Sequence, residues 1–269
     1  MSSAVAPPSV LGRYELGVPL GGGPTGEVYR ARLAGVAGFA KEYALKVFHP
    51  TLVKGDAPRE RLFGGLKAAQ GLLHPRIVRL HEHLTAESWV FAVSDLIPGV
   101  DLSRFLALTY GVGSELMPGA MLFVITQIAR TLGYAHGRGV VHAGICPTNV
   151  LVLADGDVKV TDFALLGARL GDSPADDKTL AARLPYLSPE QLVGGKITAA
   201  SDVFQLGVLA HELFTGERAF GGGSGVEVAA RRRAVARSRP RARHPAATPA
   251  QRRAASRPRP RRPARRRAS

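Results

Sequence analysis

The chain has 269 residues, 45% of them hydrophobic, which is enough for one two-lobed domain or two small ones. Sixteen Arg lie between Arg231 and Arg267, and no acidic residue follows Glu227, so the net charge of +15 belongs to the C-terminal end. Removing these sixteen from the 36 basic residues leaves 20 against 21 acidic ones, and residues 1–230 are therefore almost neutral.

Cysteine usage and hydropathy argue against a disulfide-stabilised, a secreted and a membrane-spanning protein. The single cysteine, Cys146, excludes an internal disulfide and suits a reducing cytosol. The N-terminus does not have the basic start and apolar run of a signal peptide. No segment reaches the ~18–20 apolar residues that a membrane-spanning helix needs. We therefore expect a soluble, cytoplasmic protein.

The first part of the chain, up to about residue 96, is predicted to be mostly β-structure. After a disordered segment at residues 1–12, apolar and β-branched runs alternate with turn residues, which is typical of strands. The predicted strands are Tyr14–Leu20, Glu27–Leu33, Glu42–Phe48, Ile77–His83 and Trp89–Leu96. One helix is predicted at about Pro58–Leu73.

From about Leu102 the chain is predicted to be mainly helical. Met117–Arg138 carries apolar residues at helical spacing, and Ala200–Thr215 is expected to be a second buried helix. Between them, a turn is expected to join two short strands, Val150–Leu153 and Val158–Thr161.

Residues 223–269 form an arginine-rich tail that we expect to be disordered. The tail has no Leu, Ile or aromatic residue, so it has too little apolar surface to offset the entropy of ordering. Two origins remain open for it: a GC-rich gene read in a shifted frame, or a genuine basic arm. Such an arm would attract nucleic acid or anionic lipid non-specifically.

A glycine cluster and a lysine mark the N-terminal part. Leu20–Tyr29 fits the pattern G-x-G-x-x-G-x-V, with Gly21, Gly23 and Gly26 as its glycines. In dinucleotide-binding folds such glycines open a helix, whereas here the segment continues as a predicted strand. Further along, Tyr43–Val47 fits V-A-I-K, and its lysine, Lys46, lies twenty residues after Gly26.

Four more motifs follow in the second part. Residues 139–151, Gly-Val-Val-His-Ala-Gly-Ile-Cys-Pro-Thr-Asn-Val-Leu, have the spacing of a catalytic loop. Asp162-Phe163-Ala164 is similar to D-F-G, and Leu187–Glu190 ends like A-P-E. Ser201–Gly207 is similar to the helix that anchors a catalytic loop. Over residues 14–220 the chain resembles a bacterial serine/threonine protein kinase.

The resemblance implies an α+β fold with two lobes. A β-rich N-lobe would occupy residues 13–96, and a partial helical C-lobe, lacking its last helices, would occupy residues 97–222. It also implies that ATP and Mg²⁺ are the cofactors and that a protein is the partner or substrate. His142 is expected to pack against Phe163 as a structural residue.

The resemblance further assigns a role to individual residues of the nucleotide site. The adenine would lie between Leu20, Val28, Ala44 and Leu151, with Ser94 as gatekeeper and the backbone of Asp95 and Ile97 at its edge. The loop with Gly21, Gly23 and Gly26 would close over the phosphates, and Lys46 would pair with the α- and β-phosphates. Asn149 and Asp162 would ligate the metal.

The chain departs from the family where phosphate is transferred. Gly144 stands at the position of the Asp that accepts the substrate proton, and Cys146 replaces the Lys that contacts the γ-phosphate. Arg183 takes the place of a Thr that normally hydrogen-bonds to both groups. The Glu that should orient Lys46 falls at Gly65 or Leu66. No catalytic residue is therefore intact.

Three functions remain open from the sequence. The first is a kinase-fold protein that binds Mg·ATP and transfers phosphate poorly or not at all. The second is an active serine/threonine kinase with a non-standard base, for example Asp155. The third is a non-enzymatic interaction protein or an unstable, truncated product, because missing C-lobe helices would expose the apolar faces of Met117–Arg138 and Ala200–Thr215.

Overall fold

A computed structural model describes residues 6–33, 41–111, 116–169 and 180–220. The pattern of contacts divides the chain into residues 1–233 and 234–269, and every described residue belongs to the first unit. The predicted disordered tail at residues 223–269 therefore lies outside the described residues.

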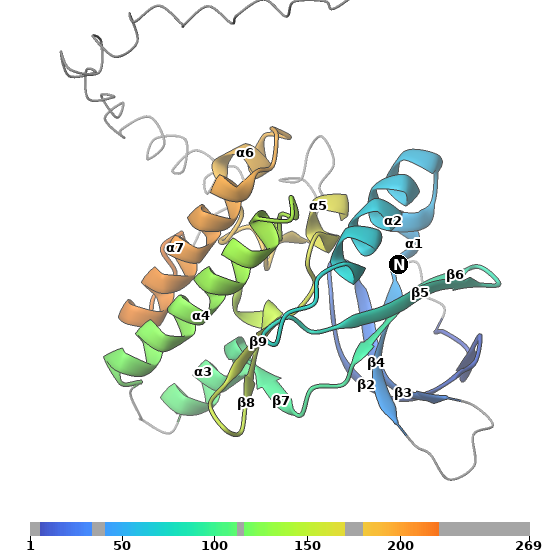
Figure 1. Ribbon diagram of the computed structural model, residues 1–269, viewed down its shortest axis with the longest axis horizontal. Helices are drawn as coiled ribbons and strands as arrows, with labels where there is room; N and C mark the ends of the chain where they lie inside the picture. The colour runs from blue at the N-terminus through green and yellow to red at the C-terminus, as the bar shows by residue number, and fades with distance from the viewer. Residues whose placement is uncertain (1–5, 34–40, 112–115, 170–179, 221–269) are drawn as a thin grey trace, which may run out of the picture. The chain divides into compact units, whose positions relative to one another are not determined.

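An antiparallel sheet forms the N-terminal lobe (Figure 1). In the spatial order β1-β2-β3-β4-β6-β5, its strands are β1 (Val10–Leu11), β2 (Tyr14–Gly23), β3 (Gly26–Leu33), β4 (Glu42–Phe48), β6 (Trp89–Asp95) and β5 (Leu80–Ala86). The short helix α1 (Pro50–Val53) and the longer helix α2 (Asp56–Gln70) follow β4. Leu62 and Leu66 of α2 are fully buried in one cluster with Phe48 and Val90 of the sheet.

The C-terminal lobe is helical, with one small sheet. Its strands are β7 (Gly99–Asp101), β8 (Val150–Leu153) and β9 (Val158–Val160), in the order β7-β8-β9. Its helices are α3 (Leu102–Gly111), α4 (Pro118–His136), the 3-10 helix η1 (Pro147–Asn149), α5 (Leu165–Arg169), α6 (Pro189–Leu192) and α7 (Ala199–Thr215). Among the described residues, no helix is long and apolar enough to cross a membrane. The predicted α+β architecture, with a β-rich N-terminal lobe and a helical C-terminal lobe, is observed.

Proline and glycine residues mark the ends of the long helices. Pro118 at the first turn of α4 has no N–H to leave unpaired, and the helix ends at His136, before Gly137 and two residues before the expected Arg138. Gly216 ends α7 in the left-handed conformation that glycine adopts at low cost, with φ of 72°. Helix α2 begins at Asp56, before the expected Pro58, and ends at Gln70 because the N–H of Gly71 turns back to the carbonyl of Ala68.

One predicted strand is displaced. The sequence predicts a strand at Ile77–His83, but β5 runs from Leu80 to Ala86. Ile77 instead forms a bridge with Val160 of β9, and the N–H of Val78 donates to the Val160 carbonyl. The first residues of the predicted strand therefore pair with the C-terminal lobe rather than with the N-terminal sheet.

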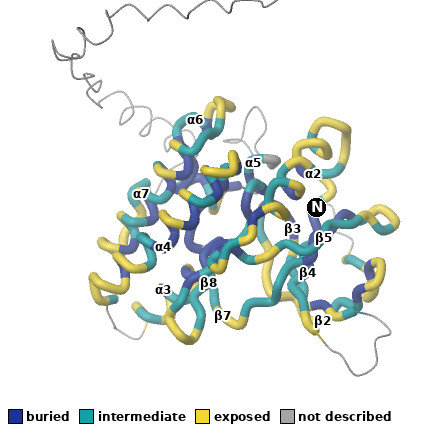
Figure 2. The backbone as a smooth tube through the Cα atoms, in the orientation of Figure 1, coloured by how far each residue is buried: buried dark blue, intermediate teal, exposed yellow. Residues whose placement is uncertain are grey.

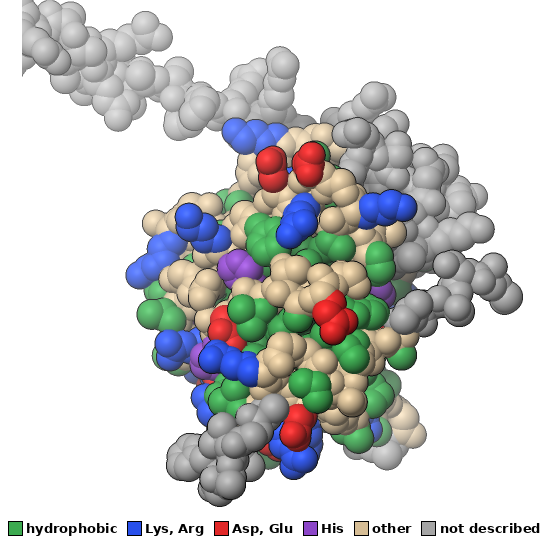
Figure 3. Space-filling model, turned by 90° about the vertical axis from the view of Figure 1, so that its right-hand side faces the viewer, with side chains coloured by type: hydrophobic (Ala, Val, Ile, Leu, Met, Phe, Trp, Pro, Cys, Tyr) green, Lys and Arg blue, Asp and Glu red, His purple; other side chains and the backbone are tan. Residues whose placement is uncertain are grey.

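The burial pattern corrects one part of the predicted core. Leu209 and Leu213 of α7 are buried in the main cluster of the C-terminal lobe, as expected. Figure 2 colours the tube by burial and shows that α7 has both buried and less buried stretches. Val203 and Phe214, which the sequence predicts among the apolar residues of this buried helix, are instead 63% and 50% exposed. On the face seen in Figure 3, Lys and Arg side chains are interspersed with Asp, Glu and hydrophobic ones, which fits the near-neutral balance of residues 1–230.

Asp202 of α7 joins this helix to the loop that precedes η1. Its side chain is fully buried and accepts hydrogen bonds from the backbone N–H groups of His142 (2.8 Å) and Ala143 (2.7 Å). The Nε2 of His136 lies 2.7 Å from the same carboxylate. Ala143 adopts a left-handed backbone with φ of 64°, which costs a non-glycine residue about 1–2 kcal/mol and must be held by such contacts.

We predict that Asp202→Ala strongly destabilises the protein. The change leaves two buried N–H donors and the His136 ring without their partner, so the free energy of unfolding should fall by about 3–5 kcal/mol. Chemical denaturation followed by circular dichroism measures it. Val203→Ala, on the exposed side of the same helix, is the control and should change stability by less than about 0.5 kcal/mol. Equal losses in both variants would contradict the anchoring role of Asp202.

Candidate functional site

The glycine cluster forms the turn of a β-hairpin over a cleft. Strands β2 and β3 pair up to Gly23 and Gly26, and the turn between them lines the cleft. A Cβ atom on Gly26 would lie 2.1 Å from the Val47 carbonyl oxygen, so only glycine fits there. His49 holds the turn, since its Nε2 donates to the Gly23 carbonyl at 2.9 Å and its backbone N–H donates to Thr25.

The structure brings the predicted nucleotide residues into one cleft of about 820 Å³. This volume lies within the range of ligand pockets. The lining includes every residue predicted to bind nucleotide or metal: Leu20, Gly21, Gly23, Gly26, Val28, Ala44, Lys46, Asp95, Ile97, Asn149, Leu151 and Asp162. The apolar members Leu20, Ala44 and Leu151 can hold a flat ring, while Lys46 provides a charge for an anion.

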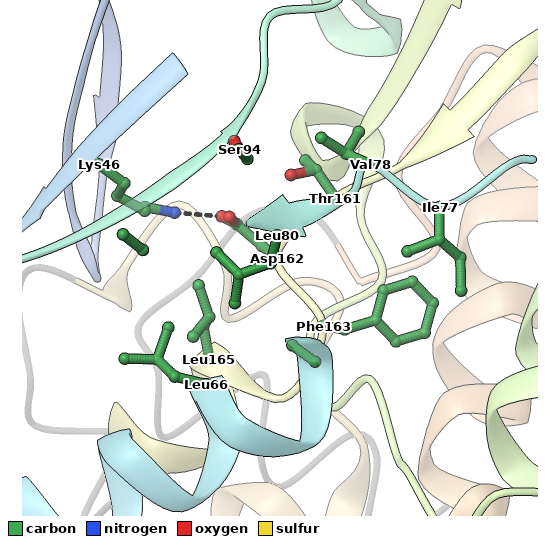
Figure 4. Close-up of a pocket in the computed structure, with 12 residues that line it drawn as sticks. Lys46, Leu66, Ile77, Val78, Leu80, Ser94, Thr161, Asp162, Phe163 and Leu165 are labelled. Atoms are coloured by element: carbon green, nitrogen blue, oxygen red, sulfur yellow. Dashed lines mark hydrogen bonds and ion pairs between the residues drawn. The ribbon is translucent and has the colours of Figure 1, made fainter. Parts of the chain in front are cut away.

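Lys46 pairs with Asp162 rather than with a residue of α2. Figure 4 shows the two side chains pointing toward one another and joined by an ion pair, and both line a small, mainly apolar cavity of about 50 Å³. Their side chains are only 12% and 21% exposed, so the pair is shielded from solvent. Leu66, one of the two predicted positions of the missing Glu, is fully buried and lines the same cavity.

Gly65, the other position predicted for that Glu, is closed by packing. A Cβ atom there would lie 2.9 Å from the Ala164 carbonyl oxygen, so α2 lies against the backbone that follows Asp162. Asp162 and Ala164 themselves adopt left-handed φ values of 65° and 61°. Position 65 thus has no room for a side chain that could draw Lys46 away from Asp162, and position 66 carries an apolar one.

His142 is a structural residue, as the sequence predicts. Its ring packs on Phe163 with 4.5 Å between centroids. Nδ1 accepts from the Gly144 N–H at 3.1 Å, so Nε2 carries the hydrogen and donates to the Thr161 carbonyl at 2.9 Å. Burial lowers the pKa of His142 and keeps the ring neutral.

Gly144 lies in a tightly packed place, where a side chain would press against a neighbour. A Cβ atom on Gly144 would lie 3.0 Å from Cβ and 3.2 Å from Cδ2 of Leu166, which is itself buried. Sequence reasoning noticed the missing Asp but missed Leu166. Nothing in the sequence signals the contact, because Leu166 reads as an ordinary apolar residue of a short helix.

Arg183 extends into the site beside Gly144. Its Nη2 donates to Oδ1 of Asn149 at 3.1 Å, and its Nη1 donates to Sγ of the buried Cys146. The Asn149 Nδ2 donates in turn to the Gly144 carbonyl at 2.9 Å. Burial lowers the pKa of Arg183 below its usual range. Both ends of the Asn149 amide therefore have protein partners.

This donor set fits one magnesium ion but not two. Magnesium is commonly held by one or two carboxylates together with substrate phosphates and water, and Asp162 can supply one such carboxylate. The amide oxygen of Asn149 accepts from a cation, Arg183, and a metal there would face the guanidinium charge. Among the described residues, no three His, Cys, Asp or Glu side chains gather to hold a metal.

Comparisons with known proteins agree with this geometry. The family model of the protein kinase domain matches residues 14–255. The chain is 37% identical over 229 residues to the serine/threonine-protein kinase PkaA of Streptomyces coelicolor, over 80% of this chain and 41% of that protein. It is 30% identical over 220 residues to the serine/threonine-protein kinase PrkC of Bacillus subtilis, over 82% of this chain and 33% of that protein.

A solved structure shows the same fold. The kinase domain of PknI from Mycobacterium tuberculosis aligns with a TM-score of 0.64 at 27% identity, over 80% of this chain and 79% of that chain. The chain spans less than half the length of the two curated relatives, so their other segments have no counterpart among its matched residues.

We predict that restoring Asp at position 144 alone destabilises the protein. Gly144→Asp forces a side chain against Leu166, and such overpacking costs about 1–3 kcal/mol. Leu166→Ala removes Cδ2, one of the two obstructing atoms, and lets the remaining Cβ shift, so the double variant should be more stable than the sum of the two single changes predicts. A double-mutant cycle on unfolding free energies measures this coupling. Additive effects would show that Leu166 does not fill the position.

Proposed function

The chain belongs to the serine/threonine protein kinase family, and we propose that it is a pseudokinase, which binds ATP but transfers little or no phosphate to protein. The observation that carries the proposal is a contrast within one site. The cleft keeps the groups that hold a nucleotide, whereas Gly144, at the position of the proton acceptor, has no side chain and packs closely against Leu166.

ATP binding is supported by the arrangement of apolar and charged groups. A base between Leu20, Ala44 and Leu151 directs the phosphates toward Lys46 and the glycine turn. Asp162 would hold one Mg²⁺, which would neutralise phosphate charge when bound. Asp95 ends β6 and Ile97 lies on the segment between β6 and β7, where backbone groups can meet the edge of the base. We propose that the lobes join at this segment, near residue 96.

Loss of transfer is supported by the groups around Gly144. A general base contributes about 10²–10⁴-fold to such reactions, and no carboxylate stands at this position. Cys146 has no charge with which to stabilise a developing phosphoryl charge, and its thiol accepts a hydrogen bond from Arg183. The relatives named above carry the name of kinase, but that activity does not transfer to a chain without these groups.

The two other candidate functions have less support. Asp155, the alternative base of an active kinase, lies exposed in the turn between β8 and β9, where its Oδ1 accepts from the backbone of Asp157. It is not among the residues that line the cleft. A non-enzymatic interaction protein is favoured by apolar side chains that are exposed on two helices, Leu122 and Phe123 of α4 and Val203 and Phe214 of α7. Binding of anionic polymers by the tail stays a proposal.

We expect ATP to stabilise the protein against heat. Ligand at 100 times its dissociation constant adds about 2.7 kcal/mol, which shifts the melting temperature of a domain of this size by roughly 5–11 °C. Lys46→Met should remove most of the shift, because the phosphates lose their cation. Lys196→Met, outside the cleft, is the matched control and should keep it. No shift in the native protein, and no displacement of a fluorescent nucleotide, would reject ATP binding.

Activity should return only when the site is rebuilt as a unit. The variant Gly144→Asp, Cys146→Lys, Leu166→Ala and Arg183→Thr regains a base, a phosphate-binding cation and the room for both. We expect radiolabel transfer to a generic protein substrate to rise by at least about 10²-fold over the native chain. The same variant carrying Asp162→Ala is the control. Transfer by the native chain well above its own Asp162→Ala variant would instead establish an active kinase.

A further inference from the structure

The guanidinium of Arg183 connects the floor of the cleft with its roof. On the floor it donates to Oδ1 of Asn149 and to Sγ of Cys146. On the roof, its Nη2 lies 3.6 Å from the point where a Cβ atom on Gly23 would be. His49, which directly follows strand β4, holds the Gly23 carbonyl by a hydrogen bond. The guanidinium of Arg183 therefore lies close to a part of the glycine turn that is held in place.

Arg183 differs from the other cation of the cleft in its partners. Lys46 pairs with Asp162, whereas no carboxylate of the described residues lies within ion-pair distance of Arg183. Its two protein acceptors, an amide oxygen and a thiol sulfur, are neutral groups. A guanidinium has five N–H donors, and Arg183 uses two of them on these acceptors. A largely desolvated cation with neutral partners favours an anionic ligand.

The order of apolar and charged residues along the cleft indicates which part of a nucleotide would supply that anion. The apolar residues Leu20, Ala44 and Leu151 line the part that can take a base, and Lys46 and Asp162 lie further along. Arg183 lines the same cleft under the glycine turn, beside Asn149. Phosphates that pass beneath the turn would therefore meet its guanidinium.

We propose that Arg183 binds the terminal phosphate of the nucleotide directly, in place of a second metal ion at Asn149 and of the lysine missing at position 146. The inference rests on the proposed nucleotide binding and deepens it. Its consequence is that ATP binds with little dependence on Mg²⁺, since a cation fixed to the protein already stands where metal charge would be needed. It also predicts a preference for ATP over ADP, because only ATP has the phosphate that reaches Arg183.

Titration of the full chain with ATP and ADP, in Mg²⁺ and in EDTA, tests the proposal. The native protein should keep its affinity for ATP within about threefold when Mg²⁺ is removed, and it should bind ADP more weakly. Arg183→Met should lose about 10- to 100-fold of its ATP affinity in EDTA, the value of a charge-assisted contact. Its ADP affinity should change little. Mg²⁺ should restore part of the loss, because the Asn149 oxygen is then released.

Controls keep the test decisive. Arg218→Met removes an Arg that pairs with Glu212 outside the cleft and should bind like the native protein. Arg183→Thr, which returns the residue type expected in the family, should reproduce Arg183→Met, and melting curves verify that both variants fold. A native protein that binds ATP only with Mg²⁺ would overturn the proposal.

Two further results would have separate meanings. Tighter ATP binding in Arg183→Met would show that the guanidinium blocks the phosphate site, which also overturns the proposal. Failure of the native protein to bind any nucleotide, with or without Mg²⁺, would reject the proposed function itself. Binding of ATP and ADP that Arg183→Met leaves unchanged would reject the role of Arg183 alone.

Discussion

The buried carboxylate of Asp202 is the contact on which the site depends. It accepts from two successive backbone N–H groups, at His142 and Ala143, and so fixes the loop before η1 to helix α7. Gln205, one turn along α7, adds a second fixed point, since its Oε1 accepts from the N–H of Ile145 at 2.9 Å. These contacts reach only the backbone of the loop. Its shape therefore does not depend on which side chains positions 143, 144 and 146 carry, and the loop can keep its path while its chemistry changes.

This separation explains why the substitutions come with compensating contacts. Leu166 fills the volume that a residue larger than Gly144 would take, and Arg183 supplies a cation where Cys146 has none. Lys46 has Asp162 as its counter-ion because α2 carries no Glu at position 65 or 66. Interiors are packed closely enough that an unfilled position of this kind would cost stability. The residues around Gly144 and Cys146 are packed closely and hydrogen-bonded to one another, so the departures from the family pattern form one connected set of contacts.

Sequence reasoning reached the fold and the composition of the cleft because both follow from order and spacing. Six motifs place Leu20, Lys46 and Asp162 in one family pattern, and the same pattern puts His142 against Phe163. Sequence reasoning could not predict contacts between segments that the motifs do not place together. Leu166 beneath Gly144 and Arg183 beneath Gly23 are pairs that only the folded chain brings together. The predicted start of β5 was wrong for a related reason. Ile77 and Val78 are residue types typical of strands, but they pair with β9. Local pattern does not specify the partner strand.

Backbone strain shows how firmly the metal-facing part of the site is held. Asp162 and Ala164 both have left-handed φ values, which cost non-glycine residues about 1–2 kcal/mol each. Ala164 stands where the family pattern has a glycine, so the chain keeps the conformation without the residue that makes it easy. It can do so because the Ala164 N–H donates to the His142 carbonyl and because α2 packs against the Ala164 carbonyl at Gly65. His142 is in turn fixed by Asp202. The carboxylate of Asp162 therefore faces Lys46 as a consequence of the same anchoring that positions the loop, and the nucleotide side of the cleft persists because it is built on the buried core of the C-terminal lobe.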